Sequence, residues 1–187
     1  MVLQLIAPPV KEPVTTAMLR DFLRLSPDQE EDLLERLIRT AREVIEQHCN
    51  LVMLPQRWLL QLANWPQSGR IALYKAPVIS IDKVQGFDAD GAVVLFNADD
   101  WRLDTDSRPQ RLYLRRPQHI TIARGLEIEL TAGLANEPED LPETLRHACL
   151  VLAGHLYDNR NSYEAVMHSL PDMVAQLVSP WLRRGRL

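Results

Sequence analysis

The chain has 187 residues, of which 46% are hydrophobic and 25% are charged, and its formal net charge is −4 at pH 7. This length is enough to bury one sizeable core and too short for two full domains. The acidic balance argues against a general nucleic-acid binder, which more often carries a basic face, and the two cysteines provide no disulfide framework.

Targeting signals are few in this sequence. Its start, MVLQLIAPPV, contains a short apolar run but neither a basic region nor a small-residue cleavage site, and no stretch approaches the length of a membrane span. We therefore expect a soluble intracellular chain with no membrane partner. In a reducing compartment Cys49 and Cys149 remain free thiols.

The N-terminal region predicts an extended arm followed by a short helix. Three prolines within residues 1–13 favour the extended arm. Thr15 is placed as the N-cap of a helix over residues 15–25, and Val14 and Leu19 are spaced for a hydrophobic staple.

A second, longer helix is predicted over residues 26–50. Ser26 is a candidate N-cap, with Pro27 at the first helical position and Gln29 where a capping box needs Glu or Gln. Its apolar stripe comprises Leu33, Leu34, Leu37, Ile38, Ala41, Val44, Ile45 and His48. The opposite face carries charge pairs four residues apart, Arg42/Glu46 among them, which we expect to be solvated.

From Gln56 the apolar period changes from helical to strand-like. Short β-branched and aromatic runs predict strands at QRWLLQLANW, RIALY, VISIDKV, AVVLF, WRLD, RLYL and LEIELT. No intervening stretch is long enough for a crossover helix, so this β-subdomain, residues 56–131, is expected to be mainly antiparallel. The stretch DADG, ending in Asp90 and Gly91, predicts a hairpin turn because glycine can supply a positive φ.

Helical patterning returns after the β-subdomain. Pro142 begins a predicted helix over residues 142–161, and a shorter helix starts at Pro171 and is stopped by Pro180. The fold class is therefore α+β, with an N-terminal helix pair, a small antiparallel β-subdomain, a long C-terminal helix, a short helix and an extended tail.

One stretch could carry acid–base chemistry. WRLDTDSRPQRLYL concentrates five charged residues around Pro109: Arg102, Asp104, Asp106, Arg108 and Arg111. Asp and Ser bond their own backbone in tight turns and Pro fixes φ there, so we interpret this stretch as two strand ends joined by a polar turn. The neighbouring arginines keep the acids ionised, which is wrong for a proton donor, and we expect no catalytic residues.

No metal or cofactor site is expected. His147 and His155 share a helix face but lie eight residues apart, about 12 Å at 1.5 Å per residue, which is too far for one ion. The seven glycines form no phosphate-cradling loop.

The C-terminal segment combines a Trp with arginines and leucines. Its residues are Trp181, Leu182, Arg183, Arg184, Arg186 and Leu187. Trp and Arg dominate protein interfaces, and an exposed Trp needs a reason, so the segment favours an interaction tail. The alternative is a frayed, solvated chain end.

Several stretches together resemble the head–tail connector (adaptor) proteins of long-tailed phages and gene transfer agents. They are, in order, VTTAMLRDFLRL, then EDLLERLIRTAREVIEQHCNLVMLPQRWLLQL, then APVISIDKVQGFDADGAVVLFNADDWRLDTDSRPQRLYL, and finally IELTAGLANEPEDLPETLRHACLVLAGHLYDNR. The likeness runs from about Val14 to Asn161. After the extended arm over residues 1–13, we therefore expect a connector domain over 14–163 and a short helix with the tail over 164–187.

The resemblance implies a structural role rather than an enzymatic one. Such proteins form a ring, typically of twelve subunits, beneath the portal in the virion neck, and they assemble in the bacterial host cytoplasm. Their partners are the portal protein, a stopper or tail-completion protein and copies of themselves. DNA passes through the channel without specific binding, and the C-terminal segment, here from Trp181, reaches into the portal.

Three alternatives remain open at this point. The chain could be another neck protein, either a stopper or a tail-completion protein, although those tend to be shorter and dominated by strands. It could be an enzyme that uses the Asp/Arg cluster at residues 102–111. It could also be a DNA-binding module, which the acidic composition disfavours.

Overall fold

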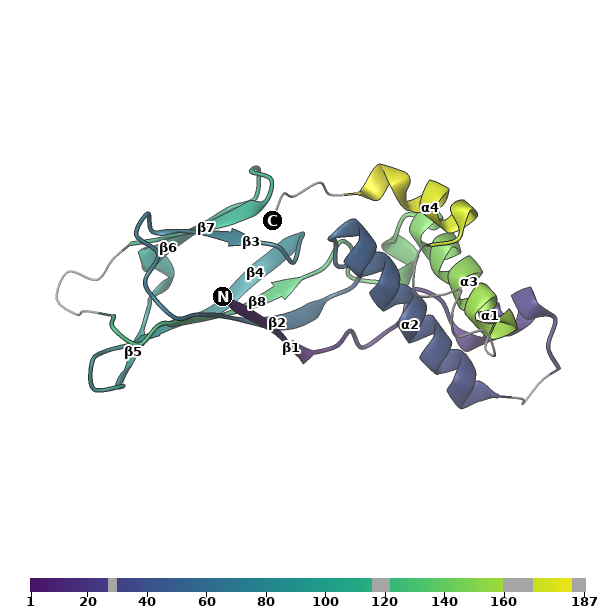
Figure 1. Ribbon diagram of the computed structural model, residues 1–187, viewed down its shortest axis with the longest axis horizontal. Helices are drawn as coiled ribbons and strands as arrows, with labels where there is room; N and C mark the ends of the chain where they lie inside the picture. The colour runs from purple at the N-terminus through teal and green to yellow at the C-terminus, as the bar shows by residue number, and fades with distance from the viewer. Residues whose placement is uncertain (27–29, 116–121, 160–169, 183–187) are drawn as a thin grey trace. The chain divides into compact units, whose positions relative to one another are not determined.

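The structure is a computed structural model that describes residues 1–26, 30–115, 122–159 and 170–182 (Figure 1). It confirms the predicted α+β class, because helices and antiparallel sheets occupy separate parts of the chain. Among the described helices, none is both long and apolar enough to cross a membrane.

The described residues form two compact units. The strand unit contains residues 1–9 and the described part of 55–134, and the helical unit contains the described parts of 10–54 and 135–184. Each unit therefore combines segments that are distant in the sequence.

The larger sheet of the strand unit has five antiparallel strands in the order β1-β2-β8-β4-β5. These strands are β1 (Val2–Ala7), β2 (Gln56–Leu62), β4 (Val78–Phe87), β5 (Val93–Leu95) and β8 (Leu126–Ala132). The central β8 alternates buried and half-buried residues, so Leu126, Ile128, Leu130 and Ala132 all point to the core.

The smaller sheet has three antiparallel strands in the order β3-β7-β6. They are β3 (Arg70–Leu73), β6 (Trp101–Asp104) and β7 (Gln110–Leu114). Buried Gln110 Oε1 accepts a hydrogen bond of 2.7 Å from Val78 N at the start of β4. This bond satisfies a buried polar side chain and joins the two sheets within the strand unit.

The N-terminal arm is a sheet strand. The sequence predicted only extended backbone here, whereas β1 pairs with β2 in a continuous register from Val2 opposite Gln61 to Leu5 opposite Trp58. Because β1 and β2 are far apart in the sequence, no local sequence pattern indicates that they pair. The two prolines that follow, Pro8 and Pro9, lie outside the strand.

The first two helices begin the helical unit. The first, α1 (Thr16–Leu23), starts as predicted, since Thr15 Oγ1 accepts a hydrogen bond of 3.2 Å from Met18 N. The second, α2 (Glu31–Cys49), ends at Asn50 in a left-handed conformation, in agreement with the predicted end.

The predicted start of α2 at Ser26 is wrong. Ser26 lies outside the helix, which begins at Glu31 after Glu30, whose φ is +60° and whose side chain makes no capping bond. Pro27 and Gln29, the rest of the predicted cap, lie outside the described residues. Local capping chemistry thus did not decide where the helix begins.

The helical unit is completed by α3 (Glu143–Asp158), α4 (Asp172–Val178) and short 3₁₀ segments at Pro138–Asp140 and Ser179–Trp181. A further 3₁₀ segment, Ala98–Asp100, precedes β6 in the strand unit. Helix α3 packs against α1, α2 and α4. A β-carbon placed at Gly154 would lie 2.9 Å from Cε1 of Phe22, so glycine permits the close approach of α1 and α3. The predicted helix over 142–161 is thereby confirmed to Asp158, and residues 160–161 lie outside the described residues.

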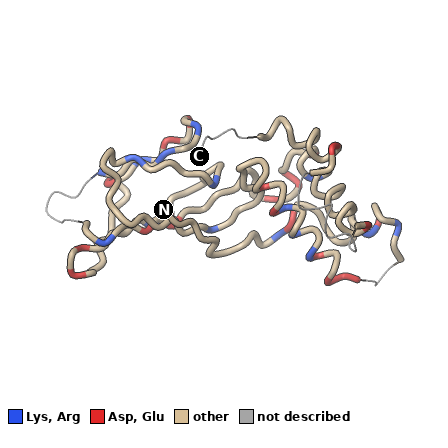
Figure 2. Tube along the Cα trace, viewed as in Figure 1, with Lys and Arg blue, Asp and Glu red and all other residues tan. Residues whose placement is uncertain are grey.

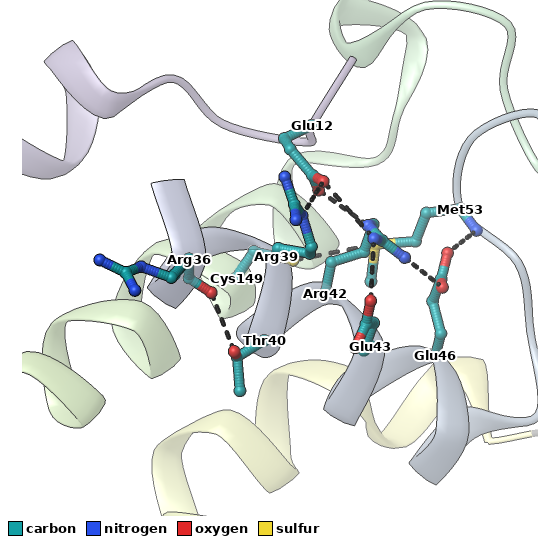
Figure 3. A network of polar contacts seen from close by, with 9 residues as sticks. All are labelled: Glu12, Arg36, Arg39, Thr40, Arg42, Glu43, Glu46, Met53 and Cys149. Atoms are coloured by element: carbon teal, nitrogen blue, oxygen red, sulfur yellow. Dashed lines mark hydrogen bonds and ion pairs between the residues drawn. The ribbon is translucent and has the colours of Figure 1, made fainter. Parts of the chain in front are cut away.

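A buried ion-pair network crosses the helical unit (Figure 3). Arg42 is 2% exposed, and its guanidinium donates from Nε to Glu12 Oε2 at 2.7 Å and from Nη1 to Glu46 Oε2 at 2.9 Å. The other oxygen of Glu46 accepts from the backbone N of Met53 at 2.8 Å. The expectation that Arg42 and Glu46 are solvated is therefore wrong, because the segments around Glu12 and Met53 cover this side of α2.

We predict that Arg42→Ala lowers the free energy of unfolding by about 3–5 kcal/mol, because it leaves the buried Glu46 carboxylate without its cation. Urea denaturation followed by circular dichroism measures this loss. Arg39→Ala is the matched control: its side chain is 59% exposed and its Nε lies 3.9 Å from the same Glu12 carboxylate. That variant should lose no more than about 0.5 kcal/mol. Equal losses would show that burial of the pair is not what stabilises the unit.

Candidate functional site

The charged stretch at residues 101–114 consists of β6, a tight turn and β7. Asp104 Oδ1 accepts hydrogen bonds of 3.1 Å from the backbone N of Asp106 and of 3.1 Å from that of Ser107. Ser107 Oγ donates to the carbonyl of Pro109 at 3.0 Å. The Asp104 side chain therefore caps the turn between the two strands.

The chemistry of Asp104 follows from these bonds. The two backbone amides, that of Ser107 above all, hold the pKa of this carboxyl below its ordinary value, with a smaller contribution from the nearby Arg102. Arg108 Nη1 donates to the backbone carbonyls of Thr105 at 2.7 Å and Ser107 at 3.0 Å. The side chains of Asp104 and Arg108 are thus engaged with the backbone, and Asp104 remains an ionised acceptor.

A basic face lies on the three-stranded sheet next to this turn. Arg70 on β3 and Arg102 on β6 both pair in register with Tyr113 on β7, and their guanidinium carbons lie 5.6 Å and 4.7 Å from its ring centroid. Arg111 shares this face, two residues before Tyr113. Among the described residues none of these three arginines has an ion pair within 4.0 Å.

Figure 2 shows Lys and Arg residues along this sheet. Stacking on an aromatic ring holds a guanidinium in place and leaves its edge N–H groups available for an anion. The arrangement therefore suits contact with carboxylate or phosphate groups. Arg102 and Arg111 belong to the charged stretch recognised in the sequence, whereas Arg70 and Tyr113 join them only through the strand register.

The DADG stretch is the turn of the β4–β5 hairpin. Asp88 Oδ1 accepts hydrogen bonds from the backbone N of Asp90 at 2.9 Å and of Ala92 at 2.8 Å. Gly91 has a φ of +87°, the left-handed region that glycine enters without strain. Asp90 contributes its backbone amide, and the side chain that organises the turn is that of Asp88.

The described part of the C-terminal segment is attached to α3. Trp181 is half-buried, and its Nε1 donates to Thr144 Oγ1 at 3.1 Å. The next residue, Leu182, is 39% exposed. The sequence suggested an exposed Trp, and it contained no local signal for the contact with Thr144. The other proposed tail residues, Arg183, Arg184, Arg186 and Leu187, lie outside the described residues.

Both cysteine thiols are buried in the helical unit. Cys149 Sγ lies 3.8 Å from Met53 Sδ, and Cys49 Sγ lies 3.9 Å from the carbonyl oxygen of Val178. Burial raises the pKa of Cys49 to about 11 and that of Cys149 further still. Within the described residues no group of three or more His, Cys, Asp or Glu side chains is arranged to hold a metal ion.

No protein-family model matches this sequence, and no curated protein matches it either. A chain of the neck of an empty GTA particle with C6 symmetry is similar, with a TM-score of 0.82 and 26% identity over 100% of this chain and 98% of that chain. A chain of the virion of a native gene transfer agent (GTA) particle has a TM-score of 0.81 and 26% identity, with the same coverage.

A third similar structure agrees in fold. It is a chain of the neck of a native GTA particle with C12 symmetry, with a TM-score of 0.76 and 24% identity over 100% of this chain and 98% of that chain. These similarities support a class, the structural virion neck proteins. The particular neighbours belong to gene transfer agent particles, and they resemble this chain over its whole length.

We predict that Asp104→Asn lowers the thermal midpoint at neutral pH and leaves it unchanged in strong acid. The folded-state pKa of Asp104 is depressed, so its stabilisation is present above the unfolded pKa and is lost as pH falls through the folded value. Calorimetry of wild type and variant across this pH range measures the difference. Asp106→Asn is the control, since only the backbone amide of Asp106 takes part in the turn bond. A gap between wild type and Asp104→Asn that does not depend on pH would contradict this account.

Proposed function

We propose that this chain is a structural protein of a virion neck that forms a ring beneath the portal and joins the DNA-filled head to the stopper and tail. The observation that carries this proposal is the full-length similarity to GTA neck chains at 26% identity. The sequence resemblance to head–tail connectors points to the same place in the particle. Assembly takes place in the cytoplasm of the bacterial host.

The ring form rests on the symmetry of the similar particles. Two of the similar chains come from necks with C6 and C12 symmetry, and a ring of twelve copies is compatible with either. The net charge of −4 fits a ring through which DNA passes, because extensive basic contact with phosphates would hold the duplex by counterion release.

The C-terminal segment is the proposed contact with the portal. The hydrogen bond from Trp181 to Thr144 anchors the start of this segment, Trp181, on α3. Three of the five residues 183–187 are arginines and the last is Leu187, a composition suited to a partner surface that offers acidic groups and an apolar pocket. Docking of this segment on the portal would bury the apolar side chains of Leu182 and Leu187, and this burial favours binding.

Ring formation is proposed to be templated. The portal ring tethers the copies side by side, which raises the effective concentration of each neighbour and converts weak subunit contacts into stable ones. The free chain is then expected to be monomeric at concentrations at which the portal-bound ring is complete.

Co-sedimentation with the cognate portal ring, followed by negative-stain imaging of the pelleted complexes, tests this function. We expect the full chain to form a ring on the portal, and a chain that ends at Leu182 to bind at least about tenfold more weakly. The shortened chain keeps Trp181 and its bond to Thr144, so circular dichroism should show an unchanged fold. A chain that ends at Pro180 removes the Trp anchor as well and should bind no better.

The outcomes of this co-sedimentation experiment distinguish the connector role from the other neck-protein roles. Equal binding by the full chain and the chain that ends at Leu182 would overturn the tail proposal and leave the ring in place. Failure of every version to bind the portal, together with binding to tail components, would favour the alternative role of stopper or tail-completion protein.

A further inference from the structure

We propose that the ring is closed by the five-stranded sheet, with β1 of one copy pairing edge to edge with β5 of the next copy. This inference rests on the ring in the proposed function and names the surface that builds it. The occupant of each sheet edge is thus a second copy of this chain.

The first edge is β1, and it has the properties of an edge strand that can pair with another chain. Within the described residues β1 pairs with β2 alone, so the backbone groups on its other side have no strand partner. Its sequence, VLQLIA, contains no charged residue, and Val2, Leu5 and Ile6 are 59%, 38% and 43% exposed. Soluble proteins usually protect such an edge with charges or proline.

The second edge is β5, at the opposite side of the same sheet. Within the part of the chain that is described, β5 pairs with β4 alone. Its three residues are uncharged, and the side chains of Val93 and Leu95 are 55% and 63% exposed. Both edge strands of the sheet therefore present exposed apolar side chains beside backbone that has no strand partner among the described residues.

One cross-strand row connects these two edges. The register places five residues in line across the sheet: Val2, Gln61, Glu127, Gln85 and Leu95. Directly opposed residues project from the same face, so the exposed side chains of Val2 and Leu95 lie on one face of the sheet.

The polar side chains in the interior of this row already have hydrogen-bond partners. Glu127 accepts hydrogen bonds from Gln61 Nε2 at 2.8 Å and from Gln85 Nε2 at 2.6 Å. Only the apolar ends of the row lack a cross-strand neighbour among the described residues. If the sheet continues into a second copy, Leu95 of that copy takes the place beside Val2, and the row repeats.

Strand direction defines the pairing. Four successive antiparallel pairings leave β1 and β5 pointing the same way. A rotation through the small angle between neighbours of a large ring preserves that direction, so β1 and β5 of adjacent copies pair in parallel. The contact joins different edges and is heterologous, which is the type of interface that closes into rings.

Cysteine cross-linking of portal-bound rings tests the pairing. The double variant Val2→Cys/Leu95→Cys should give a ladder of disulfide-linked oligomers larger than dimers on oxidation, because neighbouring strands bring Cα atoms within the roughly 4.4–6.8 Å that a disulfide spans. Within one chain the two positions are four strand spacings apart, about 19 Å, and cannot react with each other. The buried Cys49 and Cys149 provide a low background.

The single variants decide between this contact and its rival. Neither Val2→Cys nor Leu95→Cys alone should form covalent oligomers under the same oxidation. Dimers from Val2→Cys alone would indicate a two-fold β1–β1 contact and overturn the proposal. Complete portal-bound rings of the double variant without any ladder would overturn it as well.

A charge placed on the edge gives a second, independent measurement. Val2→Lys/Ile6→Lys should reduce ring occupancy on the portal about tenfold or more, while the fold is retained because both side chains are already exposed. Val10→Lys is the control: Val10 is 100% exposed and belongs to the helical unit. If Val2→Lys/Ile6→Lys and Val10→Lys form rings to the same extent, the proposed β1–β5 pairing is wrong while the proposed ring function still stands. If wild type also fails to form rings, the proposed function fails with it.

Discussion

The buried guanidinium of Arg42 is the constraint on which the helical unit depends. It lies in α2 and pairs with Glu46 of the same helix, and two bonds bring in segments from outside that helix. Glu12, from the segment before α1, accepts directly from Arg42, and the backbone N of Met53 donates to Glu46. These two segments stand near the two ends of the stretch 10–54 that the helical unit takes from the N-terminal half of the chain. Because a buried charge must keep its partners, one side chain fixes where both ends of this stretch lie.

The strand unit follows a different principle, in which polar side chains are paired in the middle of the sheet and apolar ones are left at its edges. Gln61, Glu127 and Gln85 satisfy one another across three central strands. The smaller sheet places Arg70 and Arg102 on the two sides of Tyr113. The sheet edges and the basic face around Tyr113 are therefore surfaces on which this chain can contact partners, which suits the proposed role in assembly.

The charged turn at residues 102–111 could be interpreted from the sequence because its chemistry is local. Asp104 bonds amides two and three residues ahead, and such bonds depend only on residue types and spacing. The basic face beside this turn could not be predicted from the sequence, because Arg70 and Tyr113 are far apart in the chain and meet only through the pairing of β3 with β7. The same reason hid the contact between Trp181 and Thr144.

By itself the sequence determined the α+β class, seven of the strands, the Thr15 cap and the end of α2 at Asn50, because periodicity, turn residues and caps act over a few positions. Only the tertiary structure decided that the N-terminal arm is an edge strand, that α2 begins at Glu31, and that Arg42 and Glu46 are buried. Each of these depends on what another part of the chain covers or pairs with. Burial and strand pairing are properties of the packed chain, and no local pattern contains them.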